Sequence, residues 1–337
     1  VRTMLELHEP VLSPSKINID YIDQYDMAGV HRSGWGYVVS SIHKSGMTTL
    51  HTDAILCDLY VDRTFHWNGE SNTMAGIAVV PYVKPWFGFI HHTTHVSYTP
   101  YNVVALFKNP LFIESLRCCR ALIVMTESMR GRIEKLLQSL SSPEYNHVKV
   151  LTVYHPTEFI AKDACFTMAK FKDNTKRRIV QVGAWYRDIS AIYRLNLGTN
   201  PLNYTKTALV GRKMDGYYEK QQTSSLVELL TTLENDEYDR LLSENIVFIK
   251  LVDASAVNTV VEAIVRNTPI LVNRIPPVVE YLGRDYPFYY DDLEEATRKA
   301  SSPDHVDKAY RYLKSLDKSA FTIQRFLDDL RRIVGSL

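Results

Sequence analysis

One stretch in the second half, Asn245 to Gly283, constrains the fold of this chain more than any other. Ile246–Ile249 is an apolar run of strand length, and Asn258 is placed to cap a helix whose apolar residues recur at helical spacing. The sequence Asn267-Thr268-Pro269 ends that helix, because proline cannot continue it, and Ile270–Val272 then reads as a buried parallel strand. The stretch therefore predicts strand, loop, helix and strand, with helical N–H groups directed at the loop in a manner that binds phosphate.

The rest of the chain alternates short apolar runs with helical patterns. The expected strands are 17–22, 54–61, 77–80, 86–91, 121–125, 148–153, 178–182 and 207–210. The expected helices are 36–43, 112–117, 127–140, 188–195, 223–242 and 316–334. This alternation is typical of an α/β protein in which helices cover both faces of a parallel sheet.

A length of 337 residues suggests about two domains. The polar segment 157–176 lacks periodicity, and we place a boundary near residue 165 within it. The predicted architecture is two tandem Rossmann-like, doubly wound domains, 1–165 and 166–337. The carboxyl ends of the strands in both sheets would face a common cleft, where open sheets of this type bind ligands.

Composition excludes several classes of protein. A formal net charge of +1 gives no sign of a nucleic-acid or membrane-surface binder. We expect no transmembrane segment, because no window approaches an uninterrupted apolar run of about 20 residues. Its N-terminus lacks a signal-peptide core, and none of the four cysteines has zinc-ligand spacing. We therefore expect a cytoplasmic protein without a structural metal.

Glycine and basic residues follow two expected strands of the second domain. Gly183 directly follows strand 178–182 and allows a tight turn. Arg187, after that turn, can donate two parallel hydrogen bonds to a diphosphate. Arg212 and Lys213 follow strand 207–210, so their charges would lie at the same edge of the sheet. Which of these two points inward stays open, and an ordinary surface loop is the alternative for Arg187.

Histidines gather where strand 86–91 of the first domain ends. His91, His92 and His95 lie within five residues, next to Thr93. Adjacent histidines do not readily share one metal ion, and no carboxylate lies beside them in the sequence. Because imidazole titrates near neutrality, we expect His92 or His91 to act as a base, or to bind an acceptor together with Thr93.

The segment 253–283 resembles the donor-binding segment of GT-B glycosyltransferases, and within them the group like glycosyltransferase family 4. The resemblance rests on the order small-residue loop, Asn-Thr, Val-Val-Glu-Ala, Asn-Thr-Pro, apolar strand, Pro-x-x-x-Glu-Tyr-Leu-Gly. It implies that Glu262 holds the ribose of a nucleotide sugar and that the helix start at Asn258 and Thr259 faces its diphosphate. A solvated glutamate is the alternative, since Glu262 lies off the apolar stripe. Ala254 replaces the family's other glutamate, which leaves the stereochemical outcome open.

The same resemblance assigns roles outside this segment. Arg187 and Lys213 are the positional matches for the family's basic pair on the donor phosphates. A histidine at a strand end of the first domain would contact the donor sugar or act on the acceptor. Gly34 and Trp35 match the family's glycine loop, and Arg32 beside them would touch phosphate or acceptor, an ordinary turn being the alternative.

The expected function is transfer of a sugar from a nucleotide-diphosphate sugar to a hydroxyl of a glycan or glycoconjugate acceptor. We expect no metal, because the Asp-x-Asp triplet typical of metal-dependent GT-A enzymes is missing from the sequence. The missing Gly-x-Gly-x-x-Gly and P-loop motifs count against dinucleotide oxidoreductases and P-loop NTPases. Two alternatives stay open: a GT-B nucleotide-sugar epimerase, and a non-catalytic nucleotide-sugar-binding module, the latter because of Ala254.

Overall fold

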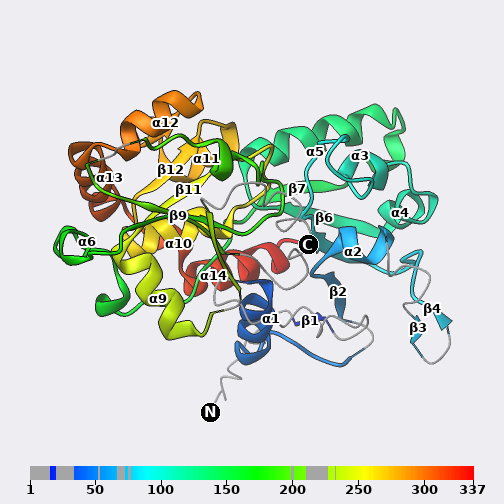
Figure 1. Cartoon of the computed structure of the whole chain (residues 1–337). Coiled ribbons are helices and arrows are strands. Elements are labelled where there is room, and N and C mark those ends of the chain that lie inside the picture. Colours follow the sequence, from blue (N-terminus) through cyan, green and yellow to red (C-terminus); the bar gives the residue numbers. More distant parts are fainter. Residues whose placement is uncertain are drawn as a thin grey trace, which may run out of the picture.

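The computed structural model describes residues 16–19, 34–51, 54–66, 73–74, 77–198, 201–209, 227–231 and 233–337. Within them the chain forms two parallel sheets with helices around each, so the predicted α/β class is confirmed (Figure 1). The predicted residues Arg32, Arg212 and Lys213 lie outside the described ranges.

The first sheet has the strand order β1-β2-β5-β6-β7, and all of its pairings are parallel. These strands are β1 (Ile17–Asn18), β2 (Ile55–Asp58), β5 (Trp86–Phe89), β6 (Cys119–Val124) and β7 (Lys149–Thr152). Its helices are α1 (Trp35–Lys44), α2 (Val61–His66), α3 (Val103–Leu106), α4 (Pro110–Ser115) and α5 (Glu127–Ser139). Short 3-10 turns span Leu116–Cys118, Pro143–Tyr145 and Lys162–Ala164.

The second sheet has the order β10-β9-β8-β11-β12-β13, again entirely parallel. Its strands are β8 (Arg178–Val182), β9 (Thr205–Leu209), β10 (Val227–Leu230), β11 (Ile246–Ile249), β12 (Ile270–Asn273) and β13 (Tyr289–Tyr290). The strand order reverses between β8 and β11, the first and fourth strands of this sheet along the chain. Ligands of doubly wound sheets bind outside the carboxyl ends of the strands at such a reversal.

Helices of the second half surround this sheet. They are α6 (Met168–Asp173), α7 (Ala191–Arg194), α9 (Asn235–Glu244), α10 (Asn258–Arg266), α11 (Pro276–Leu282), α12 (Leu293–Ala300) and α13 (Pro303–Ser315). A 3-10 turn, Ser319–Phe321, then leads into the last helix, α14 (Ile323–Val334). Helix α10 ends as predicted, because Asn267 adopts the left-handed conformation with a φ of 59°.

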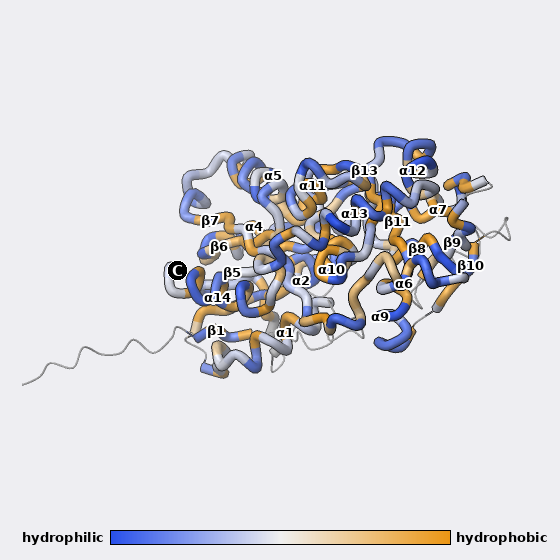
Figure 2. The backbone as a smooth tube through the Cα atoms, turned by 90° about the vertical axis from the view of Figure 1, so that its left-hand side faces the viewer, coloured by the Kyte–Doolittle hydropathy of each residue, from blue (hydrophilic) through white to orange (hydrophobic). Residues whose placement is uncertain are grey.

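Apolar side chains form separate cores for the two sheets. Figure 2 shows hydrophobic residues along the strands of both sheets and hydrophilic stretches on outer helices such as α9 and α12. Helix α14 packs on the first sheet, where Phe326 and Leu330 join a buried cluster with Val38 and Phe89. In Figure 1 it runs beside α1. The chain therefore returns to its first half at the end, and the boundary near residue 165 stays a prediction.

Four expectations about local structure were wrong. Segment 223–242 is not one helix, because Val227–Leu230 pairs with β9 as the edge strand before α9 begins at Asn235. Segment 77–80 does not join a main sheet, since Ile77–Ala78 pairs antiparallel with β3 (Thr73–Met74). The last helix begins at Ile323 rather than at residue 316. The Thr322 hydroxyl caps this start by accepting the N–H of Arg325. Asn258 is the first helical residue of α10 and not its cap, which is Val257.

Candidate functional site

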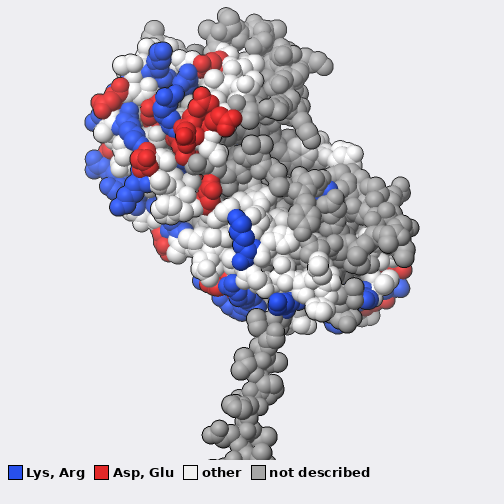
Figure 3. Space-filling model, turned by 90° about the horizontal axis from the view of Figure 1, so that it is seen from below, with Lys and Arg blue, Asp and Glu red and all other residues white. Residues whose placement is uncertain are grey.

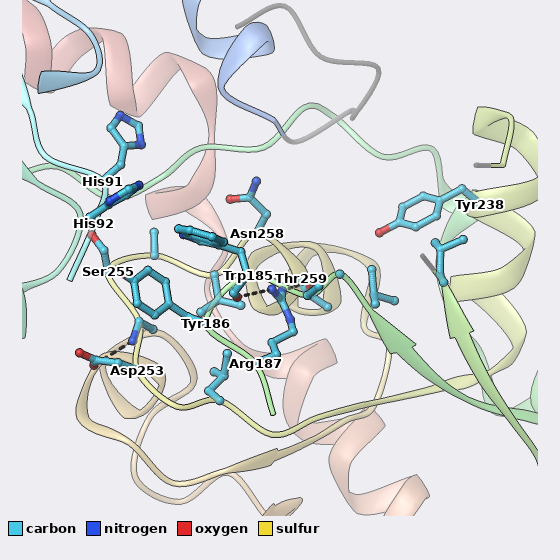
Figure 4. Close-up of a pocket in the computed structure, with 18 of the residues that line it drawn as sticks. His91, His92, Trp185, Tyr186, Arg187, Tyr238, Asp253, Ser255, Asn258 and Thr259 are labelled. Carbon is cyan, nitrogen blue, oxygen red and sulfur yellow. Dashed lines mark hydrogen bonds between the residues drawn. The ribbon is translucent and has the colours of Figure 1, made fainter. Parts of the chain in front are cut away.

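A cavity of about 750 Å3 lies between the two halves, where the strands of both sheets end (Figure 4). Residues after β2, β5, β8 and β11 line it, together with the first turns of α9 and α10. Six of the predicted site residues line it: His91, His92, Gly183, Arg187, Asn258 and Thr259. The other predicted residues within the described ranges, which are Gly34, Trp35, Thr93 and Glu262, are not among its lining residues.

The loop after β8 places a guanidinium in the cavity. Gly183 has a φ of +73°, and a Cβ there would lie 3.2 Å from Cζ of Arg187. This position therefore suits glycine for both conformation and space. Nη1 of Arg187 donates to the carbonyl of Trp185 at 2.8 Å, and Nη2 donates to Oγ1 of Thr259 at 2.9 Å.

The hydrogen bond between Arg187 and Thr259 connects the segments that follow the two strands at which the order of the sheet reverses. Thr259 lies in the first turn of α10, which follows β11, whereas Arg187 follows β8. The backbone N–H groups of the first helical turn carry the positive end of the helix dipole. A fixed cation thus lies beside a helix N-terminus, an arrangement that suits the oxygens of a phosphate group.

Glu262 is buried, with 1% of its surface exposed, so the alternative of a solvated helix glutamate was wrong. Its carboxylate accepts a hydrogen bond from the hydroxyl of Tyr238, which lines the cavity from α9. Burial, and then the neighbouring Glu262 carboxylate, raise the pKa of Tyr238 well above its ordinary value. The phenol therefore stays protonated and remains a hydrogen-bond donor at the cavity wall.

The two neighbouring histidines have different surroundings. Nδ1 of His92 lies against the carbonyl of Tyr101, an acceptor, so this nitrogen carries the hydrogen of the neutral ring. Nε2 of His92 then carries the lone pair that can accept a proton, and it lies 3.3 Å from the hydroxyl of Tyr60. Burial lowers the pKa of His91 to about 3, and its Nε2 donates to the carbonyl of Leu59 at 2.9 Å. His91 is therefore a neutral structural donor, and His92 is the better candidate for proton transfer.

Trp35 and Thr93 support the lining residues from behind. The indole of Trp35 packs edge-on against His91, with ring centroids 4.4 Å apart, while Gly34 precedes the first turn of α1. The N–H of Thr93 donates to the hydroxyl of Tyr186 at 3.2 Å. Both residues thus hold cavity side chains in position.

Arg132 and Asp253 form an ion pair beside the cavity. Nη1 of Arg132, on α5 of the first half, lies 2.7 Å from Oδ2 of Asp253 in the loop after β11. Oδ1 of Asp253 also accepts the N–H of Ala254 at 2.9 Å. The loop that carries the small residues 254–256 is therefore tied to both halves of the molecule.

The described part of the chain contains no group of three or more His, Cys, Asp or Glu residues placed to hold a metal ion. None of its helices is long and apolar enough to cross a membrane. Among the described residues on the face shown in Figure 3, basic and acidic side chains are interspersed.

Comparison with solved structures gives many matches, whereas no family model and no curated protein sequence matches the chain. The trehalose-6-phosphate synthase OtsA aligns with a TM-score of 0.61 and 12% identity, over 86% of this chain and 73% of that one. A UDP-forming α,α-trehalose-phosphate synthase from Burkholderia xenovorans gives 0.57 and 13%, over 93% and 79%. The pneumococcal O-GlcNAc transferase GtfA, solved with UDP and GlcNAc, gives 0.53 and 11%, over 75% of this chain. This chain spans about half of GtfA, 52%.

The chain has the GT-B fold. The switch point between β8 and β11 thus lies on the wall of the cleft between the two halves of a GT-B protein. Residues of both halves line the cavity.

Sequence reasoning missed several lining residues, among them Tyr60, Trp185, Tyr238, Asp253 and Ser255. Tyr60 follows β2, which pairs with β5, so the strand-end argument used for His91 and His92 could have found it. The place of Tyr238 in the cavity wall could not be predicted, because segment 223–242 was expected to form one long helix. Trp185 lies within the loop that suggested Arg187, but nothing in the sequence tells which of its aromatic residues is exposed.

Proposed function

We propose that this protein is a metal-independent glycosyltransferase, related to family 4, that moves a sugar from a nucleotide-diphosphate sugar to a hydroxyl of a glycan acceptor. The contact of Arg187 with Thr259 at the start of α10 carries the proposal. It places a cation and a helix N-terminus together at the switch point of the second sheet. The UDP in the GtfA structure and the UDP-forming synthase from Burkholderia xenovorans are consistent with a nucleoside diphosphate as leaving group.

The phosphate end would stabilise the charge that develops as the sugar bond breaks. Arg187 can turn its two Nη atoms from Thr259 and the Trp185 carbonyl toward diphosphate oxygens. The N–H groups of Asn258 and Thr259 would supply further donors, directed by the helix dipole. Arg212 and Lys213, outside the described residues, stay candidates for a second cation.

The nucleoside end would be held by Tyr238 and Glu262. The phenol lines the cavity and the carboxylate lies directly behind it, joined by a hydrogen bond. A buried carboxylate is a strong acceptor for ribose hydroxyls. We therefore assign the two residues together to the ribose.

The acceptor end would lie at the first half. Nε2 of His92 can take a proton from an acceptor hydroxyl, because Nδ1 is anchored on the Tyr101 carbonyl. In the structure the hydroxyl of Tyr60 is the hydrogen-bond partner of this nitrogen. Burial, and then the charge of Asp62, raise the pKa of the Tyr60 phenol well above its ordinary value. An entering hydroxyl would replace Tyr60 as the partner of His92. The four cysteines are reduced thiols, which suits the cytoplasm as the expected location.

A binding module without turnover is the second candidate. Ala254 favours it, since this buried position in the cavity wall carries no carboxylate. Donor hydrolysis or transfer separates an enzyme from a module. Dependence of donor consumption on an acceptor separates a transferase from an epimerase.

The test is a binding screen of UDP-, GDP-, ADP- and dTDP-sugars, by thermal shift and calorimetry, with manganese and with a chelator. We expect one base to stabilise the fold by about 2.7 kcal/mol at a hundredfold excess over Kd, unchanged by the chelator. Arg187→Ala should lose most of this effect. Arg194→Ala is the matched control, because Arg194 pairs with Asp188 and does not line the cavity. A folded protein that binds none of the nucleotides would overturn the proposal.

A further inference from the structure

Trp185 differs from the other large aromatic residues that line the cavity. Its side chain is 52% exposed, whereas Tyr186 next to it is 5% exposed and Tyr238 is 8% exposed. An indole that stays half exposed inside a concave site leaves apolar surface in contact with water, which is unfavourable without a ligand.

The backbone around Trp185 is held in an unusual conformation. Tyr186 has a φ of +54°, in the left-handed region that a residue with a side chain adopts only when its surroundings enforce it. Three hydrogen bonds do so. The hydroxyl of Tyr98 accepts the N–H of Tyr186 at 2.7 Å, the hydroxyl of Tyr186 accepts the N–H of Thr93, and its carbonyl accepts the N–H of Val252. This turn buries Tyr186 and leaves Trp185 facing the cavity.

The indole lies midway along the proposed substrate path. Its ring centroid is 5.5 Å from that of His92 and 5.4 Å from that of Tyr98, both of the first half. Its own carbonyl accepts from Arg187 at the phosphate end. Figure 4 shows Trp185 between His92 and the start of α10, with Tyr238 at the far side of the cavity. A ligand group on this indole therefore lies between the diphosphate and the reacting hydroxyl.

Ser255 adds a polar group to the same region. Its side chain is 3% exposed and lines the cavity, and its Oγ has no hydrogen-bond partner among the described residues. A buried hydroxyl without a partner is unfavourable, so a ligand hydroxyl that reaches it gains a hydrogen bond.

We propose that Trp185 is a stacking platform for a pyranose ring and that Ser255 hydrogen-bonds one of that ring's hydroxyls. One face of a pyranose presents C–H groups that pack on the indole, while its hydroxyls remain at the rim for polar partners. The inference rests on the proposed function for the direction of the path. The ring belongs either to the donor sugar or to the acceptor, and the two sources are distinguished below.

The donor arm compares each nucleoside diphosphate with its nucleotide sugar by calorimetry. If the donor sugar stacks on the indole, Trp185→Ala lowers the affinity for the nucleotide sugar about tenfold, the size of a lost aromatic contact. The affinity for the nucleoside diphosphate stays unchanged. Trp185→Phe, which keeps an aromatic face, retains most of the affinity. Ser255→Ala also lowers the affinity for the nucleotide sugar and leaves that for the nucleoside diphosphate unchanged.

The acceptor arm measures binding of methyl glucosides, galactosides and mannosides by saturation-transfer NMR. If the acceptor sugar stacks, Trp185→Ala removes the glycoside signal and affects neither nucleotide ligand. Phe159→Ala is the control in both arms, since Phe159 is 88% exposed and lies outside the cavity lining. Circular dichroism and thermal melting verify that each variant is folded.

The outcomes separate the two proposals. If Trp185→Ala matches the wild type in both arms, the platform is wrong, whatever the nucleotide screen gives. If glycosides bind through Trp185 and no nucleotide binds, the platform stands and the glycosyltransferase assignment fails.

Discussion

Oε1 of Glu280 accepts the backbone N–H of Glu127 at 2.7 Å, so a carboxylate of α11 closes the first turn of α5. Oε2 of the same carboxylate accepts the N–H of Ser128 at 3.2 Å. The hydroxyl of the next residue, Tyr281, donates to the carbonyl of Met125 just before that helix. Helix α11 belongs to the second sheet and α5 to the first, so these bonds fix one half of the GT-B fold against the other.

The first prediction concerns this cap. Glu280→Gln removes the negative charge and one of the two acceptor oxygens at a helix N-terminus, so we expect a loss of about 1–2 kcal/mol in the free energy of unfolding. Urea denaturation measures it. Glu114→Gln, at an exposed position of α4, is the control and should change stability by less than about 0.5 kcal/mol. Equal effects of the two substitutions would show that the cap contributes nothing.

The second prediction concerns Arg132 and Asp253. The pair is partly buried, with 29% and 10% of the side chains exposed, so water screens it only in part. A double-mutant cycle with Arg132→Gln and Asp253→Asn should give a coupling energy of about 1–2 kcal/mol. The same cycle on Lys308 and Asp304, a helix-surface pair at the same 2.7 Å, should give at most about 0.5 kcal/mol. Similar coupling in both cycles would contradict the importance of burial.

The third prediction concerns the ribose. Tyr238→Phe removes the hydrogen bond to Glu262 and leaves the carboxylate less well held, which should lower stability by about 1–3 kcal/mol. If the pair binds the ribose, the variant should also discriminate less between a ribonucleoside diphosphate and its 2′-deoxy form. Competition calorimetry with the two ligands measures this. Tyr193→Phe, a tyrosine that does not line the cavity, is the control, and unchanged discrimination in Tyr238→Phe would remove the pair from the ribose site.

The fourth prediction concerns the pH dependence of stability. Burial lowers the pKa of His91 to about 3, so its contribution is present above the unfolded value of about 6.5 and is lost as pH falls. Burial raises the pKa of Asp58 to about 6, so its contribution is present below about 3.9 and is lost as pH rises toward 6. Between pH 4 and 6 the two contributions oppose each other and largely cancel.

Substituting either group should make the pH-dependent contribution of the other group to stability measurable. In Asp58→Asn we expect stability to fall as pH decreases from 6 to 4, more steeply than in the wild type by up to about 1.4 kcal/mol per pH unit. In His91→Gln stability should instead fall, relative to the wild type, as pH increases over the same range. His147→Gln, at an exposed position, is the control. Parallel urea-derived stability curves for all variants would refute the assignment.

Much of the second half could be predicted from local sequence. The strand–helix–strand unit around Asn258 is encoded by apolar spacing and by the stop at Asn267, and both are local signals. The segment 223–242 was mispredicted because Val227–Leu230 becomes a strand only when β9 offers its edge. Pairing between distant segments outweighs local helical propensity in such a case.

The sequence by itself determined the α/β class, the loop and helix that follow β11, and the gathering of histidines at the end of β5. It did so because side-chain periodicity, capping residues and prolines act over a few neighbours. Only the tertiary structure decided that the pKa of His91 is low, that Glu262 lies behind Tyr238, and that Trp185 faces the cavity. Burial, pKa and side-chain direction depend on residues far away in the chain, and those neighbours exist only once the two sheets have packed together.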